Sequence, residues 1–366
     1  MQAAAELSAI LQGVILLNKA RINFIADFIL GLIKVRTVNW VEVAQAFSGS
    51  SKLSSKYRRI QRFFKECTIC KTVTAEIITA FFPPPKNGWV LSLDRTNWNF
   101  GIFKINILML SITYHNLAIP LIWIMLPKKG NSNTEERIKL MQMFLKIFSC
   151  RHIASLLGDR EFIGDDWITW LHASRIKFTI RIKNNQKVLN KKGKLVKCRK
   201  LFYMSSIRGR VIKNPVFIGK SEVFIAGKKL DTGEWLIVIT SHDAKNALSR
   251  YKLRWGIETL FAAVKTRGFN LEQTHITCMD KIDTLIALLA IAYIWAYKIG
   301  EITVKKEPIK VKSHGKRQQS VFRVGLDLLR MTLLNWQSYL NEIQFHLLVF
   351  KDNISEMLIF DPIGEN

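Results

Sequence analysis

Short apolar runs of strand type alternate with helical patterns through the middle of the chain. Strands are expected at 89–94, 104–113, 118–126, 153–158 and 177–182, with helices at 134–148 and 164–174. The order is three strands followed by alternating helices and strands. It predicts an α/β fold built on a mixed five-stranded sheet with flanking helices.

The segment before this region has helical patterns and basic residues. Residues 1–80 read as helical, and 38–47 and 53–66, separated by a break at Ser48–Ser51, resemble a helix-turn-helix. The second of these helices carries Lys56, Arg58, Arg59 and Arg62 beside aromatic residues. A helix of this kind recognises DNA ends, or it is an ordinary amphipathic helix with a solvated face. The prolines in 81–88 cannot continue a helix and mark a linker.

The later part of the chain is first β-rich and then helical. Residues 184–243 hold many lysines and short β-type runs, whereas 279–350 are mostly helical. The apolar run 284–297 is shorter than the roughly 20 residues of a membrane span, so we expect a core helix and no membrane partner. The basic stretch 304–318 is a DNA-contacting loop or a flexible linker. The amphipathic pair within 320–350 is a packing or dimer surface.

Composition narrows the classes of partner and compartment. The formal net charge is +27 with a pI of about 10.0, which implies a polyanionic partner. Hydrophobic content of 49% and ten Trp favour a folded core over a basic tail. Five scattered Cys predict reduced thiols in a cytosolic protein, and the N-terminus has no signal-peptide pattern.

The segment YKLRWGIETLFAAVK carries the most informative polar residues. At about 100° per residue, these polar residues fall within an arc of roughly 60° on a helix: Tyr251, Arg254, Glu258 and Lys265. The opposite side is apolar and is expected to pack: Leu253, Ile257, Leu260 and Val264. A hydroxyl, two cations and a carboxylate suit a phosphate backbone beside a metal ion. The same spacing also occurs as weak ion pairs on solvated helices.

Two further acids follow apolar strands. Asp94 is expected at the end of strand 89–94, and Asp159 at the end of strand 153–158. Each could simply cap a following helix. Together with Glu258 they form a set of three carboxylates without a His or Cys ligand set, which suits Mg²⁺ or Mn²⁺.

These residues resemble the DDE triad of bacterial insertion-sequence transposases. The run Tyr251-x2-Arg254-x3-Glu258-x6-Lys265 is similar to the YREK signature of the insertion sequence four family. Flanking segments also resemble the family: SLDRTNW, GDREF, KTRGFNLEQTH and SHGKRQQSVFRVGLDLL. The resemblance covers roughly residues 35–335.

The resemblance implies an RNase H-like catalytic core interrupted by a β-rich insertion. The implied layout is a helical DNA-binding domain (1–82), a core (83–183 and 244–300), the insertion (184–243) and a C-terminal helical region for dimerisation (301–366). Trp235 stands at the position of a family Trp that stacks on a base flipped out at the transposon end. Arg181 stands at the position of a family Arg that helps to hold that transposon end. As alternatives, Trp235 is a core aromatic and Arg181 a solvated strand end.

The implied activity is cut-and-paste transposition with two Mg²⁺ or Mn²⁺ ions held by Asp94, Asp159 and Glu258. Tyr251, Arg254 and Lys265 would hold phosphates of the element's end. The expected partners are double-stranded DNA, as inverted repeats and target, and a second copy of the chain in a paired-end complex. The expected location is the bacterial cytoplasm, at the nucleoid. Two alternatives stay open: an RNase H-like nuclease without strand transfer, and a non-catalytic DNA-binding transposon relic.

Overall fold

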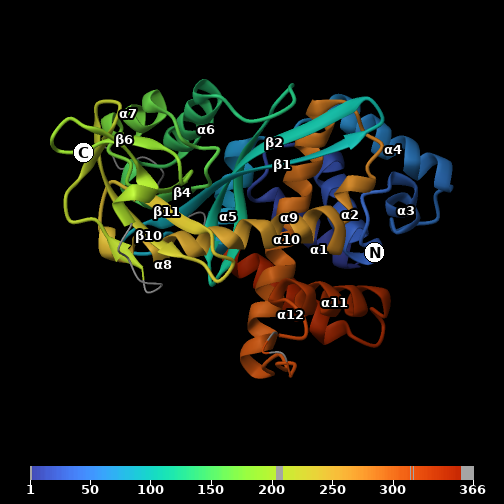
Figure 1. Cartoon of the computed structure of the whole chain (residues 1–366). Coiled ribbons are helices and arrows are strands. Elements are labelled where there is room, and N and C mark those ends of the chain that lie inside the picture. The colour runs from blue at the N-terminus through green and yellow to red at the C-terminus, as the bar shows by residue number, and fades with distance from the viewer. Residues whose placement is uncertain (1, 203–208, 314, 316, 356–366) are drawn as a thin grey trace, which may run out of the picture. The chain divides into compact units, whose positions relative to one another are not determined.

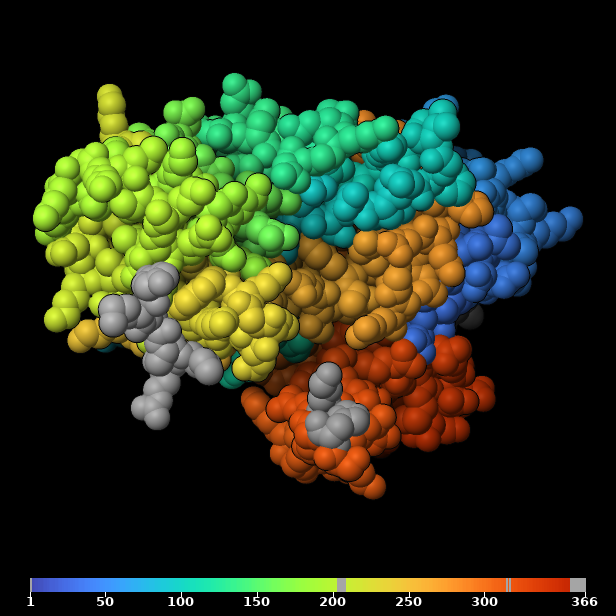
Figure 2. Space-filling model, viewed as in Figure 1, coloured from blue at the N-terminus to red at the C-terminus, as the bar shows by residue number. Residues whose placement is uncertain are grey.

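The structure is a computed structural model that describes residues 2–202, 209–313, 315 and 317–355. The other residues are drawn in grey in Figures 1 and 2, and they include parts of the predicted insertion and of the basic stretch 304–318. The chain divides into two compact units. We call them the helical unit (Met1–Pro83, Trp98–Ile105, Phe261–Asn366) and the sheet unit (Pro84–Asn97, Asn106–Leu260).

The helical unit is built from segments at both ends of the chain. Its helices confirm the helical reading of residues 1–80 and of most of 279–350. In chain order they are α1 (Gln2–Gln12), α2 (Lys19–Val35), α3 (Trp40–Gln45), α4 (Leu53–Glu66), α5 (Lys71–Phe81), α10 (Met279–Lys306), α11 (Val321–Leu334) and α12 (Leu340–Ser355).

The long helix α10 forms the core of this unit. In the described part of the chain it is the one helix long and apolar enough to cross a membrane, but 89% of its most apolar 18-residue window is buried. A helix that is apolar on all sides belongs in the interior of a protein. The Trp295 indole on α10 donates to the carbonyl of His346 on α12 at 3.0 Å. The predicted core helix is therefore confirmed, as part of a longer element than the run 284–297.

Aromatic side chains join α2 to α4. Phe24 stacks on Phe63 with ring centroids 4.1 Å apart, and Phe28 meets Phe64 edge-on at 5.3 Å. Trp40 of α3 also stacks on Phe64, at 4.9 Å. The apolar face of α4 is thus fixed against its neighbours, and its basic residues lie around the remaining surface.

The sheet unit holds most of one large mixed sheet, whose strands are coloured from teal to yellow-green in Figure 1. The strand order is β3-β2-β1-β4-β5-β11-β10-β9-β6-β7, with β8 paired to β10. β1 is parallel to β4 and β4 to β5, whereas β2 pairs antiparallel with β3. The strands are β1 (Trp89–Phe100), β2 (Phe103–Tyr114), β3 (Leu117–Met125), β4 (Ile153–Gly158), β5 (Phe178–Ile182), β6 (Lys187–Leu189), β7 (Leu195–Lys197), β8 (Arg210–Val211), β9 (Val216–Ile218), β10 (Ser221–Lys229) and β11 (Trp235–Thr240).

Helices in this unit lie between and after the strands. α6 (Thr134–Ile147) contacts β3, and α7 (Asp165–Ala173) contacts α6 and β10. α8 (Ala247–Lys252) packs on β5, β10 and β11, and α9 (Gly256–Ala262) follows it. All five predicted strands and both predicted helices of this region are confirmed.

Two features of the sheet differ from the sequence prediction. Among the described residues the sheet has eleven strands and not five, because β11 pairs antiparallel with β5 and extends the sheet into the β-rich segment. β1 continues to Phe100, so Asp94 lies within the strand and not at its end. Apolar residues in a strand-type pattern indicate where a strand is buried. β1 continues beyond Asp94 with mostly polar residues, so the sequence pattern did not predict this part of the strand.

The close approach of α10 and α11 depends on two glycines. A Cβ on Gly325 would collide with the carbonyl oxygen of Ala296, and a Cβ on Gly300 would collide with that of Val321. We expect Gly325→Ala to lower the free energy of unfolding by at least about 1–3 kcal/mol, because the two helices must separate. Thermal melting checks this. Gly13→Ala is the control, since its Cβ meets only an ordinary contact with Ile10, 3.5 Å away. Equal melting temperatures for the two variants would contradict this packing.

Candidate active site

The two aspartates leave neighbouring parallel strands side by side. Leu93 of β1 pairs with Gly158 of β4 at the last step of their ladder, and Asp94 and Asp159 are the next residues. Neither acid caps a helix, because Asp94 lies within β1 and the N-cap of α7 is Gly164. The helix-capping alternative is therefore excluded for both.

The segment with the polar signature is helical but irregular. α8 ends at Lys252, a 3-10 turn covers Leu253–Trp255, α9 follows, and a π-helical turn covers Ala263–Arg267. Gly256 passes so close to β3 that a Cβ there would lie 2.6 Å from the backbone carbon of Leu117. This contact requires glycine, and it presses the turn that carries Arg254 against the sheet.

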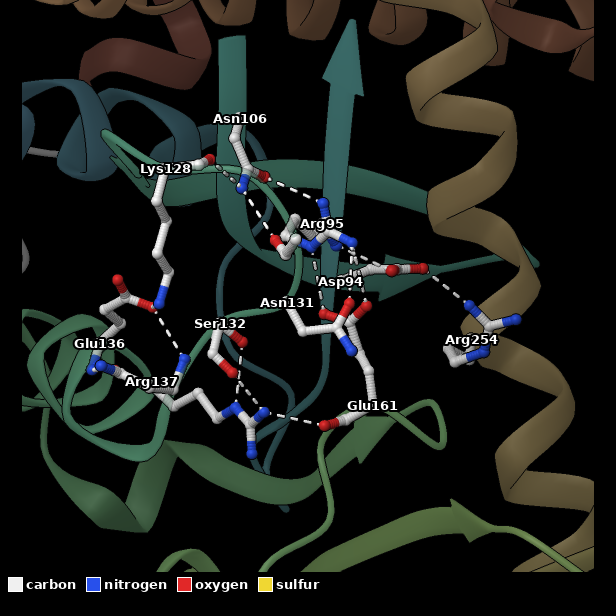
Figure 3. Close-up of polar contacts among 12 residues, drawn as sticks. Asp94, Arg95, Asn106, Lys128, Asn131, Ser132, Glu136, Arg137, Glu161 and Arg254 are labelled. Carbon is white, nitrogen blue, oxygen red and sulfur yellow. Dashed lines mark hydrogen bonds and ion pairs between the residues drawn. The ribbon is translucent and has the colours of Figure 1, made fainter. Parts of the chain in front are cut away.

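Four hydrogen bonds join the signature residues to both aspartates. Arg254 donates from Nη1 to Asp94 and from Nη2 to Glu258, each at 2.7 Å. Its Nε donates to the Tyr251 hydroxyl at 3.1 Å, and that hydroxyl donates to Asp159 at 3.1 Å. Figure 3 shows Arg254 reaching Asp94 from the helical segment. The structure thus brings together Asp94, Asp159, Glu258, Tyr251 and Arg254.

The alternative of weak ion pairs on a solvated helix surface is wrong for two of the polar residues. Tyr251 is 2% exposed and Arg254 4% exposed, whereas Glu258 is exposed. Tyr251 packs in an apolar cluster with Ala226, Leu236, Val238 and Ala247. On the other side of the segment, Ile257 and Leu260 are buried as expected. Buried side chains therefore occur on both sides of this segment, and the polar side is not a solvated surface.

Burial and charge set the ionisation of these groups. Burial raises the pKa of Asp94 to about 6, although the Arg254 guanidinium and the Arg95 amide act to lower it. Burial acts to lower the pKa of Arg254, but the Tyr251 and Asp94 oxygens outweigh this effect and the pKa is raised. Burial also raises the pKa of Tyr251 to about 12, so its hydroxyl stays protonated and can donate to Asp159.

A second set of polar residues, which the sequence analysis missed, joins the two aspartate-bearing segments. Arg95 contacts Glu161 through two atom pairs at 3.4 Å, and its Nη1 and Nη2 donate to Asn106 and Asn131 at 3.1 Å (Figure 3). Arg137, which is 5% exposed, donates to the Glu161 carbonyl at 2.8 Å. The available signal was a charge close to each acid: Arg95 directly follows Asp94, and Glu161, opposite in charge to Arg95, lies two residues after Asp159.

Lys265 belongs to the other unit. It lies in the π-helical turn, forms an ion pair with Glu272 at 2.6 Å and stands 5.9 Å from the centre of the Trp98 ring. All three of these residues lie in the helical unit. The uniform helix that placed Lys265 in one arc with the other signature residues does not form.

Trp235 and Arg181 lie on the strands that extend the sheet. Trp235 begins β11, is partly buried and has its ring 5.4 Å from Phe202. Arg181 on β5 pairs in register with Val238 and lies 3.9 Å from the Glu234 carboxylate. Arg181 is also close enough to Tyr251 for its charge to act on the pKa of that hydroxyl.

The four basic residues of α4 that were expected to bind DNA differ in their contacts. The Lys56 ammonium donates to the Phe47 carbonyl at 2.8 Å, and Arg59 pairs with Asp27 at 2.8 Å. Arg58 and Arg62 are exposed. Two of the four are therefore used to hold the helical unit together, and two face solvent.

The carboxylates fit a divalent metal by chemistry, since all of their donor atoms are hard oxygens. Among the described residues, no three His, Cys, Asp or Glu side chains lie close enough to form a metal site. The Arg254 guanidinium is the cation that now contacts Asp94 and Glu258. It supplies the positive charge that a metal ion would bring to these oxygens.

Carboxylates on neighbouring strands, an arginine and a strongly basic chain define a protein suited to phosphoryl chemistry on a polyanion. The family described as the transposase DDE domain matches residues 86–295, which is 210 of the 366 residues. The chain belongs to this family, and a transposase acts on DNA.

The chain also resembles solved structures, among them a transposase complex. The cryo-EM structure of the piggyBac transposase synaptic complex with hairpin DNA is 13% identical, with a TM-score of 0.47 over 96% of this chain and 78% of that chain. A score at this level does not bear on the fold or the function. No curated protein matches the chain in sequence.

The buried pair of Arg254 and Asp94 makes a first test of the site. The two side chains are 5% and 17% exposed, so Arg254→Ala leaves a buried carboxylate without its cation. We expect a loss of about 3–5 kcal/mol in unfolding free energy. In a double-mutant cycle with Asp94→Asn, the coupling should be about 1–3 kcal/mol, measured by denaturant unfolding.

The control is an exposed arginine–aspartate pair elsewhere in the chain. Arg323 and Asp327 are 36% and 41% exposed. Their cycle should give a coupling of about 0–1 kcal/mol. Equal couplings for the two pairs would mean that Arg254 does not neutralise Asp94.

Proposed function

We propose that this chain is a cut-and-paste DNA transposase of the insertion sequence four family, with Asp94, Asp159 and Glu258 as its catalytic carboxylates. The observation that carries the proposal is the hydrogen-bonded link through Arg254 and Tyr251, which connects all three acids. Arg254 and Asp94, which form one of these bonds, are 160 positions apart in sequence. The signature spacing and the strand order β3-β2-β1-β4-β5 support an RNase H-like core around them.

The carboxylates would hold the divalent cation that transposase DDE domains use. We propose two Mg²⁺ or Mn²⁺ ions at Asp94, Asp159 and Glu258. When bound, such ions activate an attacking oxygen and stabilise the leaving oxygen of a phosphodiester. Arg95 and Glu161 fix the segments that present the two aspartates, so these oxygens need little rearrangement on binding.

The reaction would be in-line displacement at phosphorus. In cleavage, a water oxygen bonds to phosphorus and the bond from phosphorus to the 3′ oxygen breaks. In strand transfer, the freed 3′ oxygen bonds to a phosphorus of target DNA, and the target's own 3′ oxygen leaves. The family resemblance adds a hairpin at the element end between these steps. Tyr251, Arg254 and Lys265 would hold phosphates, with Arg254 exchanging a carboxylate for a phosphate oxygen.

Other parts of the chain would contact DNA or a second copy. Arg58 and Arg62 on α4 face solvent and suit backbone phosphates of the element end, and Lys56 and Arg59 would support them. Trp235 and Arg181 would contact the end beside the site. We propose the domain layout 1–82, 83–183 with 244–300, 184–243 and 301–366, in a bacterial cytoplasmic protein associated with the nucleoid.

The C-terminal helices supply a surface for a homodimer. Large apolar side chains around α11 and α12 are exposed, and they suit burial against a second copy. They are Met331, Leu334, Trp336, Leu340, Phe345 and Leu348.

The catalytic assignment predicts that three conservative variants lose cleavage but retain DNA binding. Asp94→Asn, Asp159→Asn and Glu258→Gln each remove a ligand charge without removing a cation that contacts DNA. We expect Mg²⁺-dependent nicking to fall at least 1,000-fold, on the order of the largest loss for one electrostatic group. Gel-shift affinity for the element ends should change less than about threefold.

Asp231→Asn is the control, because Asp231 is an exposed acid on a turn of the same unit. Full nicking by any one of the three variants would remove that residue from the site.

A strand-transfer assay with pre-cut ends separates the two catalytic alternatives. A transposase joins the ends to target DNA, and a nuclease only degrades them.

A further prediction concerns the exchange of cations at the site. Arg254→Ala leaves the carboxylates without their own cation, so Mn²⁺ should stabilise this variant more than the wild type. At a concentration 100 times Kd, binding to the folded state alone is worth about 2.7 kcal/mol. Thermal melting with and without Mn²⁺ measures the effect. The added Asp94→Asn change should abolish it, and equal Mn²⁺ stabilisation of wild type and Arg254→Ala would contradict it.

A further inference from the structure

Two arginines in the helical unit share a single carboxylate, and two further arginines lie beside them. Arg36, directly after α2, lies 3.5 Å from Asp327 on α11, and Arg323 on α11 lies 2.6 Å from the same side chain. Both guanidinium groups also donate to the backbone carbonyl of Arg267, at 3.4 and 3.3 Å. Arg330, three residues beyond Asp327 on α11, donates from Nε to the Lys34 carbonyl at 2.8 Å. We call Arg36, Arg267, Arg323 and Arg330 the arginine cluster.

Positive charge in this cluster exceeds negative charge. The guanidinium groups of Arg36 and Arg323 contact one carboxylate, and the pKa of Arg36 is lowered by its burial and by the positive charges of Arg323 and Arg330, although Asp327 acts to raise it. The backbone fixes this crowding, since Arg36 caps α2 in the left-handed conformation with φ of 59°. Like charges held together at a partly buried site are stabilised by an anion that approaches them.

The cluster also keeps donors directed to solvent. Within the described residues, both terminal amino groups of Arg330, Nη2 of Arg323 and the exposed Arg267 side chain make no hydrogen bond or ion pair. A purely structural cluster that ties α2 to α11 would need only the bonds to Asp327, to the Arg267 carbonyl and to the Lys34 carbonyl. The unused donors are therefore free for a ligand.

The spacing of the cluster suits a chain of phosphates. Arg323 and Arg330 are seven residues apart on α11, about 10 Å along the helix axis. Cations distributed along a helix in this way can contact more than one phosphate of a nucleic acid strand.

We propose that the arginine cluster binds the phosphodiester backbone of duplex DNA, independently of the carboxylate site in the sheet unit. The inference takes DNA as the substrate from the family of the chain, and it does not depend on which acids are catalytic. Each guanidinium that contacts a phosphate would add an increment to affinity that is insensitive to sequence and weakens with salt.

The test measures the binding of a fluorescein-labelled random-sequence duplex by fluorescence anisotropy, at salt concentrations between about 50 and 200 mM. All variants are made in the Asp94→Asn chain, so that DNA cleavage does not interfere. Arg267→Gln with Arg330→Gln removes two cations whose side chains make at most one internal bond. We expect affinity to fall about 10- to 100-fold and the slope of log K against log salt to become shallower by about 1–2. Arg330→Lys should restore part of the slope.

The matched control is Lys139→Gln with Lys146→Gln, which removes the same charge from exposed positions of α6. An equal loss in the control would mean that only net charge matters and would overturn the proposal. Unchanged DNA binding in the cluster variant would overturn it as well. The same measurement is repeated with about 10 mM inorganic phosphate. If phosphate abolishes the difference in DNA affinity between the cluster variant and the Asp94→Asn background, the cluster is a small-anion site instead. Melting curves check that both variants fold. If the double variant does not fold, Arg267→Gln alone, at an exposed side chain, makes the same test.

Discussion

The burial of a charged aspartate beside an arginine is the constraint on which the sheet unit depends. Removing a carboxylate from water costs several kcal/mol unless a cation and hydrogen bonds compensate it. Asp94 lies on a central strand, and its cation, Arg254, comes from a helical segment 160 residues later in the chain. The sheet and this segment must therefore dock together before Asp94 can be buried as a charged group. The same docking brings Glu258 and Tyr251 toward the strand ends, so the ion pair that stabilises the fold also assembles the candidate site.

A buried ion pair alone does not fix the position of its carboxylate. Here further hydrogen bonds from residues near β1 and β4 hold the aspartate-bearing segments in place. Arg95 and Glu161 join β1 to the segment after β4, and Asn106 donates to the carbonyls of Lys128 and Gly130 at 3.0 Å. Arg137 in turn holds the Glu161 backbone. Supporting contacts of this kind fix the positions of ligands or charges within tenths of an ångström. The aspartates are thus held by their neighbours in the sheet, and Arg254 can exchange partners without losing them.

Local patterns predicted the elements of this fold, but not the long-range contacts among them. The strand runs 89–94 and 153–158 and the helix 53–66 could be located because burial alternates or repeats within a few residues. The pairing of β5 with β11 could not, because nothing in either strand specifies a partner nearly 60 residues away. The burial of Arg254 was missed for the same reason: a helix with an arginine reads as solvated until the carboxylate that it meets is known. The acids themselves were found because charged residues directly after apolar strands are conspicuous in the sequence.

The irregular helix explains why the signature residues do not form the single arc that a uniform helix predicts. The expected arc of roughly 60° assumed a constant 100° per residue from Tyr251 to Lys265. A 3-10 turn advances about 120° per residue and a π-helical turn less than an α-helix, so the phase is lost on both sides of α9. Tyr251, Arg254 and Glu258 stay together because the 3-10 turn at Leu253–Trp255 tightens the segment against β3, where Gly256 allows close approach. Lys265 lies beyond the second change of phase and pairs with Glu272. Such π-helical turns are frequent at functional sites. Here the turn breaks the phase between Glu258 and Lys265, so the phosphate-binding role proposed for Lys265 does not follow from the arc of a uniform helix.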